Sequence, residues 1–201
     1  MQLYENALWG GVAHIDANQN DLTAQQWNAY ASSLNIDKTY PGINGIGVIY
    51  NVQPSDMASY LSKERQTRPG YQLHPKHAQP EDWPITYIEP VEPNQKAVGL
   101  DMAFETNRYT GVKKARDSGK AQLTGPISLV QDSKKTPGFL FYTPFYLNGT
   151  KPATLEARQA KIKGVTYAPF IMSKLLQGTL ATENRHVWIR IADEGELLYE
   201  D

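Results

Sequence analysis

The chain has 201 residues, of which 40% are hydrophobic and 20% are charged, a balance that suits one globular domain or two small subdomains and excludes a disordered chain. Its formal net charge of −1 provides no attraction for a polyanion, so no nucleic-acid partner is expected. The absence of cysteine excludes disulfides, thiol catalysis and cysteine-held zinc, but leaves the compartment open. The uncharged runs are far shorter than the roughly 20 residues of a bilayer span, so we expect the chain as given to be soluble.

Two amphipathic helices are predicted at the start of the chain. Apolar residues between positions 3 and 15, beginning with Leu3 and ending with Ile15, fall on one helical stripe. Further on, Thr23 and Gln26 form a capping box, and apolar or aromatic residues follow at helical spacing: Trp27, Tyr30, Ala31 and Leu34. A Pro-Gly pair then ends the pattern.

The rest of the chain alternates short strands with helices. Strands are expected over residues 43–52, 83–88, 121–130, 138–147, 164–171 and 186–191, and helices over residues 55–66, 107–118 and 173–177. Thr106 and Gly119 are the candidate caps of the helix at 107–118. A polar turn at 131–137 joins two of the strands as a hairpin. Because hairpins dominate, the fold class is α+β with an antiparallel sheet.

A metal-binding cluster is the first chemical hypothesis to test. His74, His77, Glu81 and Asp82 offer nitrogen and oxygen ligands for a divalent metal. However, prolines hold this segment extended, and H-x-x-H on a loop is not a known ligand spacing. An exposed polar loop is therefore favoured, and no metal or other cofactor is predicted.

Other catalytic and binding motifs are missing or weak. There is no G-x-S-x-G, and the GINGIG stretch at residues 42–47 lacks the spacing of a phosphate-binding loop, so it predicts a turn and a close-packed strand. Four cations lie on or just after the helix at 107–118: Lys113, Lys114, Arg116 and Lys120. Acidic residues are interspersed among them and no stacking aromatic shares their face, which favours a solvated helix surface.

Four segments in order resemble one family. They are PGINGIGVIYNV (41–52), ITYIEPVEPNQKAVGLDMAFETNR (85–108), ARDSGKAQLTGPISLV (115–130) and GFLFYTPFY (138–146). Their order and spacing resemble the CHASE family, the extracellular sensory domains of histidine kinases, nucleotide cyclases and diguanylate cyclases. The helices that precede them resemble the family's N-terminal stalk.

The resemblance implies an α+β architecture in which a stalk helix bears two PAS-like subdomains with antiparallel sheets. Residues 1–40 would be the stalk and second helix, residues 41–178 the membrane-distal ligand-binding subdomain, and residues 179–201 the start of the membrane-proximal one. Transmembrane helices outside this chain would flank it, which places it in the periplasm or outside the cell as a fragment of a cell-membrane receptor.

The resemblance also implies signalling rather than catalysis in this fragment. The parent would carry a histidine kinase or diguanylate cyclase on the cytoplasmic side. The opening helix would couple ligand binding to that output, packed against its copy in a homodimer, although packing on its own subdomain explains its apolar stripe equally well.

The proposed ligand site centres on the helix at 107–118. In the plant cytokinin receptors of this family, an Asp on this helix binds the adenine ring, and counting back from GKA-x-LT puts Arg108 at that position. A guanidinium can only donate hydrogen bonds, so the expected ligand is a carboxylate or phosphate and not an adenine-type compound. The alternative is an Arg108 that pairs with Glu105 or is solvated.

Other pocket positions carry over from the resemblance. Met102 would line the pocket, Val130 would offer backbone contacts, and Tyr109 lies on the inner face of the helix. Tyr142 replaces a small Thr, given a hairpin turn about two residues longer, and would shrink the cavity to suit a small ligand. Asp101, at a strand end, is expected to cap backbone N–H groups.

Two other classes of function stay open. The first is a metal-dependent hydrolase that uses His74, His77 and Glu81. The second is a module for protein or peptide partners, which predicts a closed, fully packed interior around Met102 and Tyr142. The favoured prediction is an extracytoplasmic sensory domain that binds a small anionic molecule.

Overall fold

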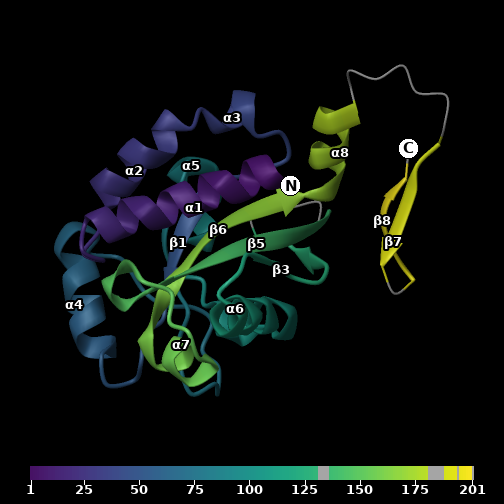
Figure 1. The fold of residues 1–201 in the computed structure, drawn as a ribbon. Helices are drawn as coiled ribbons and strands as arrows, with labels where there is room; N and C mark the ends of the chain where they lie inside the picture. Colours follow the sequence, from purple (N-terminus) through teal and green to yellow (C-terminus); the bar gives the residue numbers. More distant parts are fainter. Residues whose placement is uncertain (131–135, 181–187, 194, 201) are drawn as a thin grey trace.

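An antiparallel sheet of six strands organises the chain, and helices cover both of its faces (Figure 1). The computed structural model describes residues 1–130, 136–180, 188–193 and 195–200. The strands are β1 (Ile46–Tyr50), β2 (Ile85–Glu89), β3 (Gln122–Leu123), β4 (Ile127–Ser128), β5 (Pro137–Tyr146) and β6 (Ile162–Ile171). Their order is β2-β1-β6-β5-β3, and β4 also pairs with β5. The α+β prediction is confirmed, whereas its PAS-like and stalk parts stay predictions.

Helices and a small second sheet complete the fold. The helices are α1 (Gln2–Ala17), α2 (Ala24–Ser33), α3 (Ile36–Thr39), α4 (Met57–Thr67), α5 (Val91–Asn94), α6 (Thr106–Ser118), α7 (Leu155–Lys161) and α8 (Met172–Leu180), with short 3₁₀ turns η1 (Gln95–Ala97), η2 (Met102–Phe104) and η3 (Leu147–Gly149). Strands β7 (Arg190–Asp193) and β8 (Glu196–Glu200) form a separate antiparallel pair. All six strands of the main sheet fall within the predicted 41–178 subdomain, whose boundaries stay a prediction.

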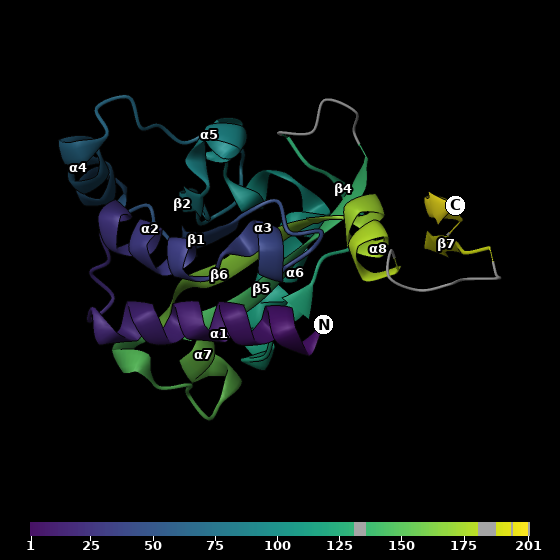
Figure 2. The same cartoon turned by 90° about the horizontal axis from the view of Figure 1, so that it is seen from above.

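The two faces of the main sheet carry separate apolar cores, because successive side chains of a strand point to opposite faces. On β5, Leu140 and Tyr142 belong to the core beneath α6, whereas Phe141 and Phe145 belong to the core beneath α1 and α2. Tyr167 of β6 lies opposite Tyr142 in the register and shares the α6 side. The helices α1, α2 and α3 lie together over the other face (Figure 2).

Helix α1 packs on the sheet of its own subdomain. Leu8 and Ile15 are buried as the predicted stripe requires, but the prediction for Leu3 is wrong: Leu3 is exposed, and its neighbour Tyr4 is buried instead. The hydroxyl of Thr166 on β6 donates to the backbone oxygen of Leu8 at 3.0 Å. This bond attaches α1 to β6 through a buried polar contact.

Helix α2 begins as predicted. The Thr23 side chain accepts from the backbone N–H of Gln26, and the Gln26 side chain accepts from the Thr23 backbone N–H, which completes the capping box. Trp27 is fully buried, and its indole N–H donates to the backbone oxygen of Ile46 at 3.1 Å. The helix is thereby joined to the first residue of β1.

Two predictions about local structure need correction, and one helix was missed. The strand expected over 121–130 is instead two short strands, β3 and β4, because Pro126 lies between them and has no N–H to donate to a ladder. The N-cap of α6 is Glu105 rather than Thr106, since the Glu105 carboxylate accepts from the backbone N–H groups of Asn107 and Arg108. Helix α7 was not predicted. Gly119 ends α6 at φ 61°, as expected.

Parts of two further predictions lie outside the described residues. These are positions 131–135 of the expected hairpin turn, including its added length, and positions 186–187 of the last expected strand. In the part of the chain that the structure describes, no helix combines the length and the apolar character needed to cross a bilayer.

Candidate ligand-binding site

Arg108 is a buried cation on the first turn of α6. Only 4% of its surface is exposed, so the alternative of a solvated Arg108 is wrong. Its Nη2 donates to the backbone oxygen of Ser128 at 2.7 Å, but its Nε has no hydrogen-bond partner. The Glu105 carboxylate, which caps the helix, lies 3.7 Å from Nε and gives a long ion pair. Burial lowers the pKa of Arg108, and nearby acidic groups partly oppose that change.

Two tyrosine hydroxyls are buried near this guanidinium. Tyr142 and Tyr167 face each other across β5 and β6, are 0% and 1% exposed, and have hydroxyl groups without hydrogen-bond partners. Burial raises the pKa of both phenols, whereas the positive charge of Arg108 lowers it. The three side chains therefore bring unsatisfied donors into one interior region. Sequence reasoning missed Tyr167, because only strand register brings it beside Tyr142.

Two glycines leave room for these tyrosine rings. A Cβ atom at Gly111 on α6 would lie 3.0 Å from Cε2 of Tyr142, and a Cβ at Gly47 on β1 would lie 2.3 Å from Cε1 of Tyr167. The expectation of a close-packed strand at GINGIG is confirmed at Gly47. Helix α6 and strand β1 can approach the tyrosines closely because neither carries a side chain at the point of contact.

The other predicted ligand residues share this side of the sheet. Met102 is fully buried in the same apolar core as Tyr142, and Val130 packs against that core while half-buried. Tyr109 also belongs to the core, but its hydroxyl donates to the Glu81 carboxylate at 3.2 Å. The structure thus brings the predicted residues to one core, and the polar group of Tyr109 is engaged elsewhere.

The metal-binding alternative weighed from the sequence does not come together in space, because two of its residues, His74 and Glu81, have other partners. A ring nitrogen of His74, Nε2, lies 3.1 Å from the backbone oxygen of Val98. The Glu81 carboxylate accepts from four donors, which are Asn51 Nδ2 at 2.8 Å, Gln53 Nε2 at 3.3 Å, Tyr109 OH at 3.2 Å and Arg116 Nη1 at 3.3 Å. His77 instead lies beside Asp82 and Asp101. A hydrolase built on His74, His77 and Glu81 loses its geometric basis.

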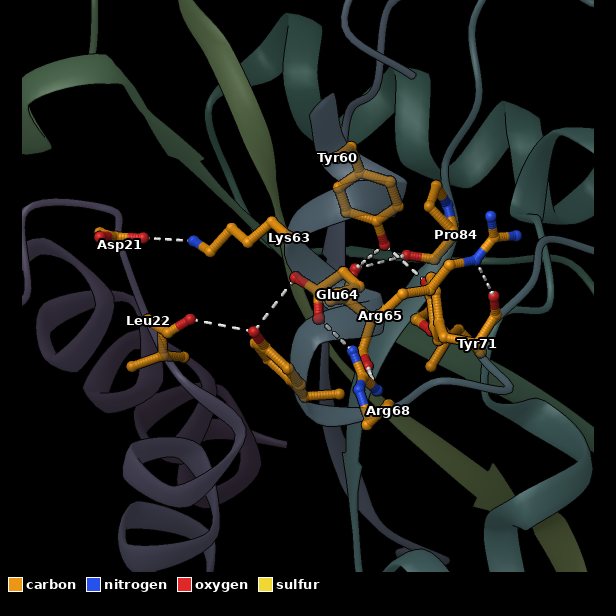
Figure 3. Close-up of polar contacts among 12 residues, drawn as sticks. Asp21, Leu22, Tyr60, Lys63, Glu64, Arg65, Arg68, Tyr71 and Pro84 are labelled. Carbon is orange, nitrogen blue, oxygen red and sulfur yellow. Dashed lines mark hydrogen bonds and ion pairs between the residues drawn. The ribbon is translucent and has the colours of Figure 1, made fainter. Parts of the chain in front are cut away.

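A cavity of about 330 Å³ opens at a different place, beside α4. Two of its charged lining residues are already paired, because Lys63 contacts Asp21 and Glu64 contacts Arg68 (Figure 3). The Tyr50 hydroxyl, which also lines the cavity, lacks a hydrogen-bond partner. Since Lys63 and Glu64 are paired within the protein, whereas three buried polar groups near Arg108 lack partners, we place the candidate site in the interior around Arg108.

Removing either unpaired hydroxyl is expected to leave the ligand-free protein as stable as before or more stable. A buried polar group without a partner costs about 1–3 kcal/mol, so Tyr142→Phe and Tyr167→Phe should each raise the free energy of unfolding by up to about that amount. The matched control is Tyr87→Phe. The Tyr87 hydroxyl donates to the backbone oxygen of Leu22 at 2.9 Å, so this variant should lose about 1 kcal/mol of the free energy of unfolding. Urea unfolding measures all three, and losses at 142 and 167 equal to that of the control would contradict the assignment.

Comparison with known proteins identifies the family of the chain. The family model of the CHASE domain matches residues 20–199, which is most of the chain. No curated protein matches the sequence. The match extends over the sheet, α6 and the interior residues described above. The chain therefore belongs to the CHASE domain family, the extracytoplasmic sensory domains of signalling receptors.

Proposed function

We propose that this domain senses a small anion, a carboxylate or phosphate compound, in the interior between the sheet and α6. One observation carries the proposal: Arg108 Nε and the hydroxyls of Tyr142 and Tyr167 are buried in the same region without hydrogen-bond partners. Buried polar groups are almost always paired in native proteins. A guanidinium and two phenols are donors that match the oxygen acceptors of an anion.

The ligand is expected to be small and to enter by displacing a wall. Met102 and Tyr142 are both 0% exposed, so the interior around them is closed. The alternative function, a module for protein or peptide partners, also predicts a closed interior. Packing alone does not account for the unpaired donors, which supports the anion site. Strand β4 is the wall most directly linked to Arg108, since it pairs with β5 at only two positions and its Ser128 backbone oxygen accepts from the guanidinium.

Signalling follows from linkage between ligand binding and conformation. An anion that binds one arrangement of α6 and β4 better than another shifts the population toward that arrangement, within the limit set by the difference in affinity. In the membrane receptor, α1 would pass this shift to the flanking transmembrane helices, in a homodimer, and on to a cytoplasmic kinase or cyclase. The domain itself performs no catalysis in this scheme.

A thermal-shift screen tests the ligand class. The panel contains short mono- and dicarboxylates, inorganic phosphate, amino acids and adenine derivatives. At about 100 times its dissociation constant, a ligand adds about 2.7 kcal/mol, or roughly 5–10 °C for a domain of this size. We expect such a shift for a carboxylate or phosphate and its loss in Arg108→Gln. Lys114→Gln is the matched control, because Lys114 is an exposed cation on the same helix.

Three outcomes would count against the proposal. An unchanged shift in Arg108→Gln would remove the guanidinium from the site. Stabilisation by adenine derivatives would contradict the exclusion of adenine-type ligands. No response to the whole panel would favour the protein- or peptide-binding module instead.

A further inference from the structure

Three ionisable side chains meet where the loop that precedes β2 lies against Asp101, the N-cap of η2. The Nε2 atom of His77 lies 3.4 Å from Oδ1 of Asp82 and 3.3 Å from Oδ2 of Asp101. One ligand atom from each residue lies within 4.8 Å of the others. This His77-Asp82-Asp101 cluster is separate from the anion site, and its components come from positions that are up to 24 residues apart.

The deepest carboxylate of the cluster is oriented into it with one oxygen unpaired. Asp101 is 0% exposed, and its Oδ1 accepts from the backbone N–H groups of Trp83 at 3.0 Å and Ala103 at 2.8 Å. Its Oδ2 has no hydrogen-bond partner, and neither has the buried Nε2 of His77 that it faces. The backbone thus fixes Asp101 so that a buried, unpartnered oxygen points at an unpartnered ring nitrogen.

The distances from His77 to the two carboxylates fit a tetrahedral metal. Metal–ligand bonds of about 2.0–2.2 Å at tetrahedral angles put neighbouring ligand atoms about 3.3–3.6 Å apart, and His77 lies 3.4 Å and 3.3 Å from the two carboxylate oxygens. We infer that His77, Asp82 and Asp101 form a binding site for a divalent transition metal, with zinc as the best-fitting ion. One imidazole and two carboxylates suit zinc, which also ranks near the top of the divalent affinity order.

The setting of Asp82 supports a cation at this place. Its carboxylate has an oxygen within 4.8 Å of an oxygen of the buried Asp101 carboxylate. Two carboxylates held close together repel each other, and a divalent cation removes that repulsion. The Asp82 side chain is 27% exposed, which gives an ion a path from solvent and leaves room for a water as fourth ligand.

Metal binding requires one local rearrangement at His77. The backbone N–H of Gln79 donates to Nδ1 of His77 at 3.1 Å, which assigns the ring proton to Nε2. A metal on Nε2 moves this proton to Nδ1, so the Gln79 N–H must turn to water, which its exposed position permits. The amide signal of Gln79 should therefore shift when the metal binds.

The test uses the metal alone on chelator-treated protein. Cobalt(II) is titrated while its visible absorption is recorded, and zinc is then added to displace it. We expect one ion per chain and an affinity at least about tenfold lower in Asp82→Asn and in His77→Gln. His74→Gln is the matched control, because His74 lies on the same loop but contacts the backbone of Val98. It should bind cobalt as the unchanged protein does.

The result is decisive in either direction. Saturable binding that both ligand variants weaken, with a shift of the Gln79 amide, supports the site. No saturable binding up to millimolar cobalt overturns it, and so does equal binding by His77→Gln and the unchanged protein. Circular dichroism tests whether each variant folds. If His77→Gln does not fold, the result for Asp82→Asn is used by itself. Because no anion is present, the outcome is independent of the proposed function.

Discussion

Replacing Gly47 by alanine is expected to destabilise the protein by about 3 kcal/mol, the upper end of what overpacking a core costs. The added Cβ would lie 2.3 Å from Cε1 of Tyr167 and 2.4 Å from the backbone oxygen of Tyr87. The tyrosine ring can move only into a filled core, and the backbone oxygen belongs to the neighbouring strand β2. Strand β1 would therefore shift against both of its neighbours.

Urea unfolding measures this loss, and Gly70→Ala is the matched control. No atom lies within 4 Å of a Cβ placed at Gly70, so alanine there should be neutral or stabilise by less than about 1 kcal/mol. A Gly47→Ala variant as stable as Gly70→Ala would show that β1 does not need a glycine at this point. It would also remove the steric argument for the position of Tyr167.

Replacing Arg68 by methionine is expected to cost about 2–4 kcal/mol. Arg68 forms an ion pair with Glu64, whose side chain is 5% exposed, and donates to the backbone oxygen of Thr86 at 2.6 Å (Figure 3). Removing one partner of a buried pair leaves the other charge uncompensated, which costs about 3–5 kcal/mol. The Arg68 side chain is 25% exposed, and access of water reduces that penalty.

A second variant separates the lost charge pair from lost packing. Replacing Glu64 by leucine and Arg68 by methionine together removes both charges, so the double variant should be more stable than Arg68→Met alone. Denaturant unfolding of the unchanged protein, of Glu64→Leu and Arg68→Met alone, and of the double variant gives the coupling energy. If Arg68→Met and the double variant lose the same stability, the contact of Arg68 with the Tyr71 and Tyr87 rings, at 4.5 Å and 5.0 Å, carries its contribution instead.

Features that depend on neighbouring residues could be predicted from the sequence. The capping box of Thr23 and Gln26 needs only the two residues and the turn between them, and it forms as expected. The C-cap at Gly119 is equally local. The break between β3 and β4 was also visible in principle, because Pro126 has no N–H. The apolar pattern around it nevertheless favours one continuous strand.

Features that depend on register or on distant segments could not be predicted. Tyr167 joins Tyr142 only because β5 and β6 pair in one particular register. The Asp101 carboxylate caps the backbone N–H of Ala103 as expected, but its second oxygen meets His77, which lies 24 residues earlier. The predicted partners of His77 were close in sequence, whereas one of its neighbours in space comes from another segment. Spacing along a loop does not determine such contacts.

Two successive residues of β6 act on opposite sides of the molecule. Thr166 is bonded to α1 through the backbone oxygen of Leu8, and Tyr167 lies in the interior near Arg108. The sheet is a single layer of backbone, so no side chain separates the two contacts. We expect a displacement of the Tyr167 ring to move the β6 backbone, and the adjacent Thr166 to pass this movement to α1. Because β6 pairs with both β1 and β5, we expect these two strands to move with it.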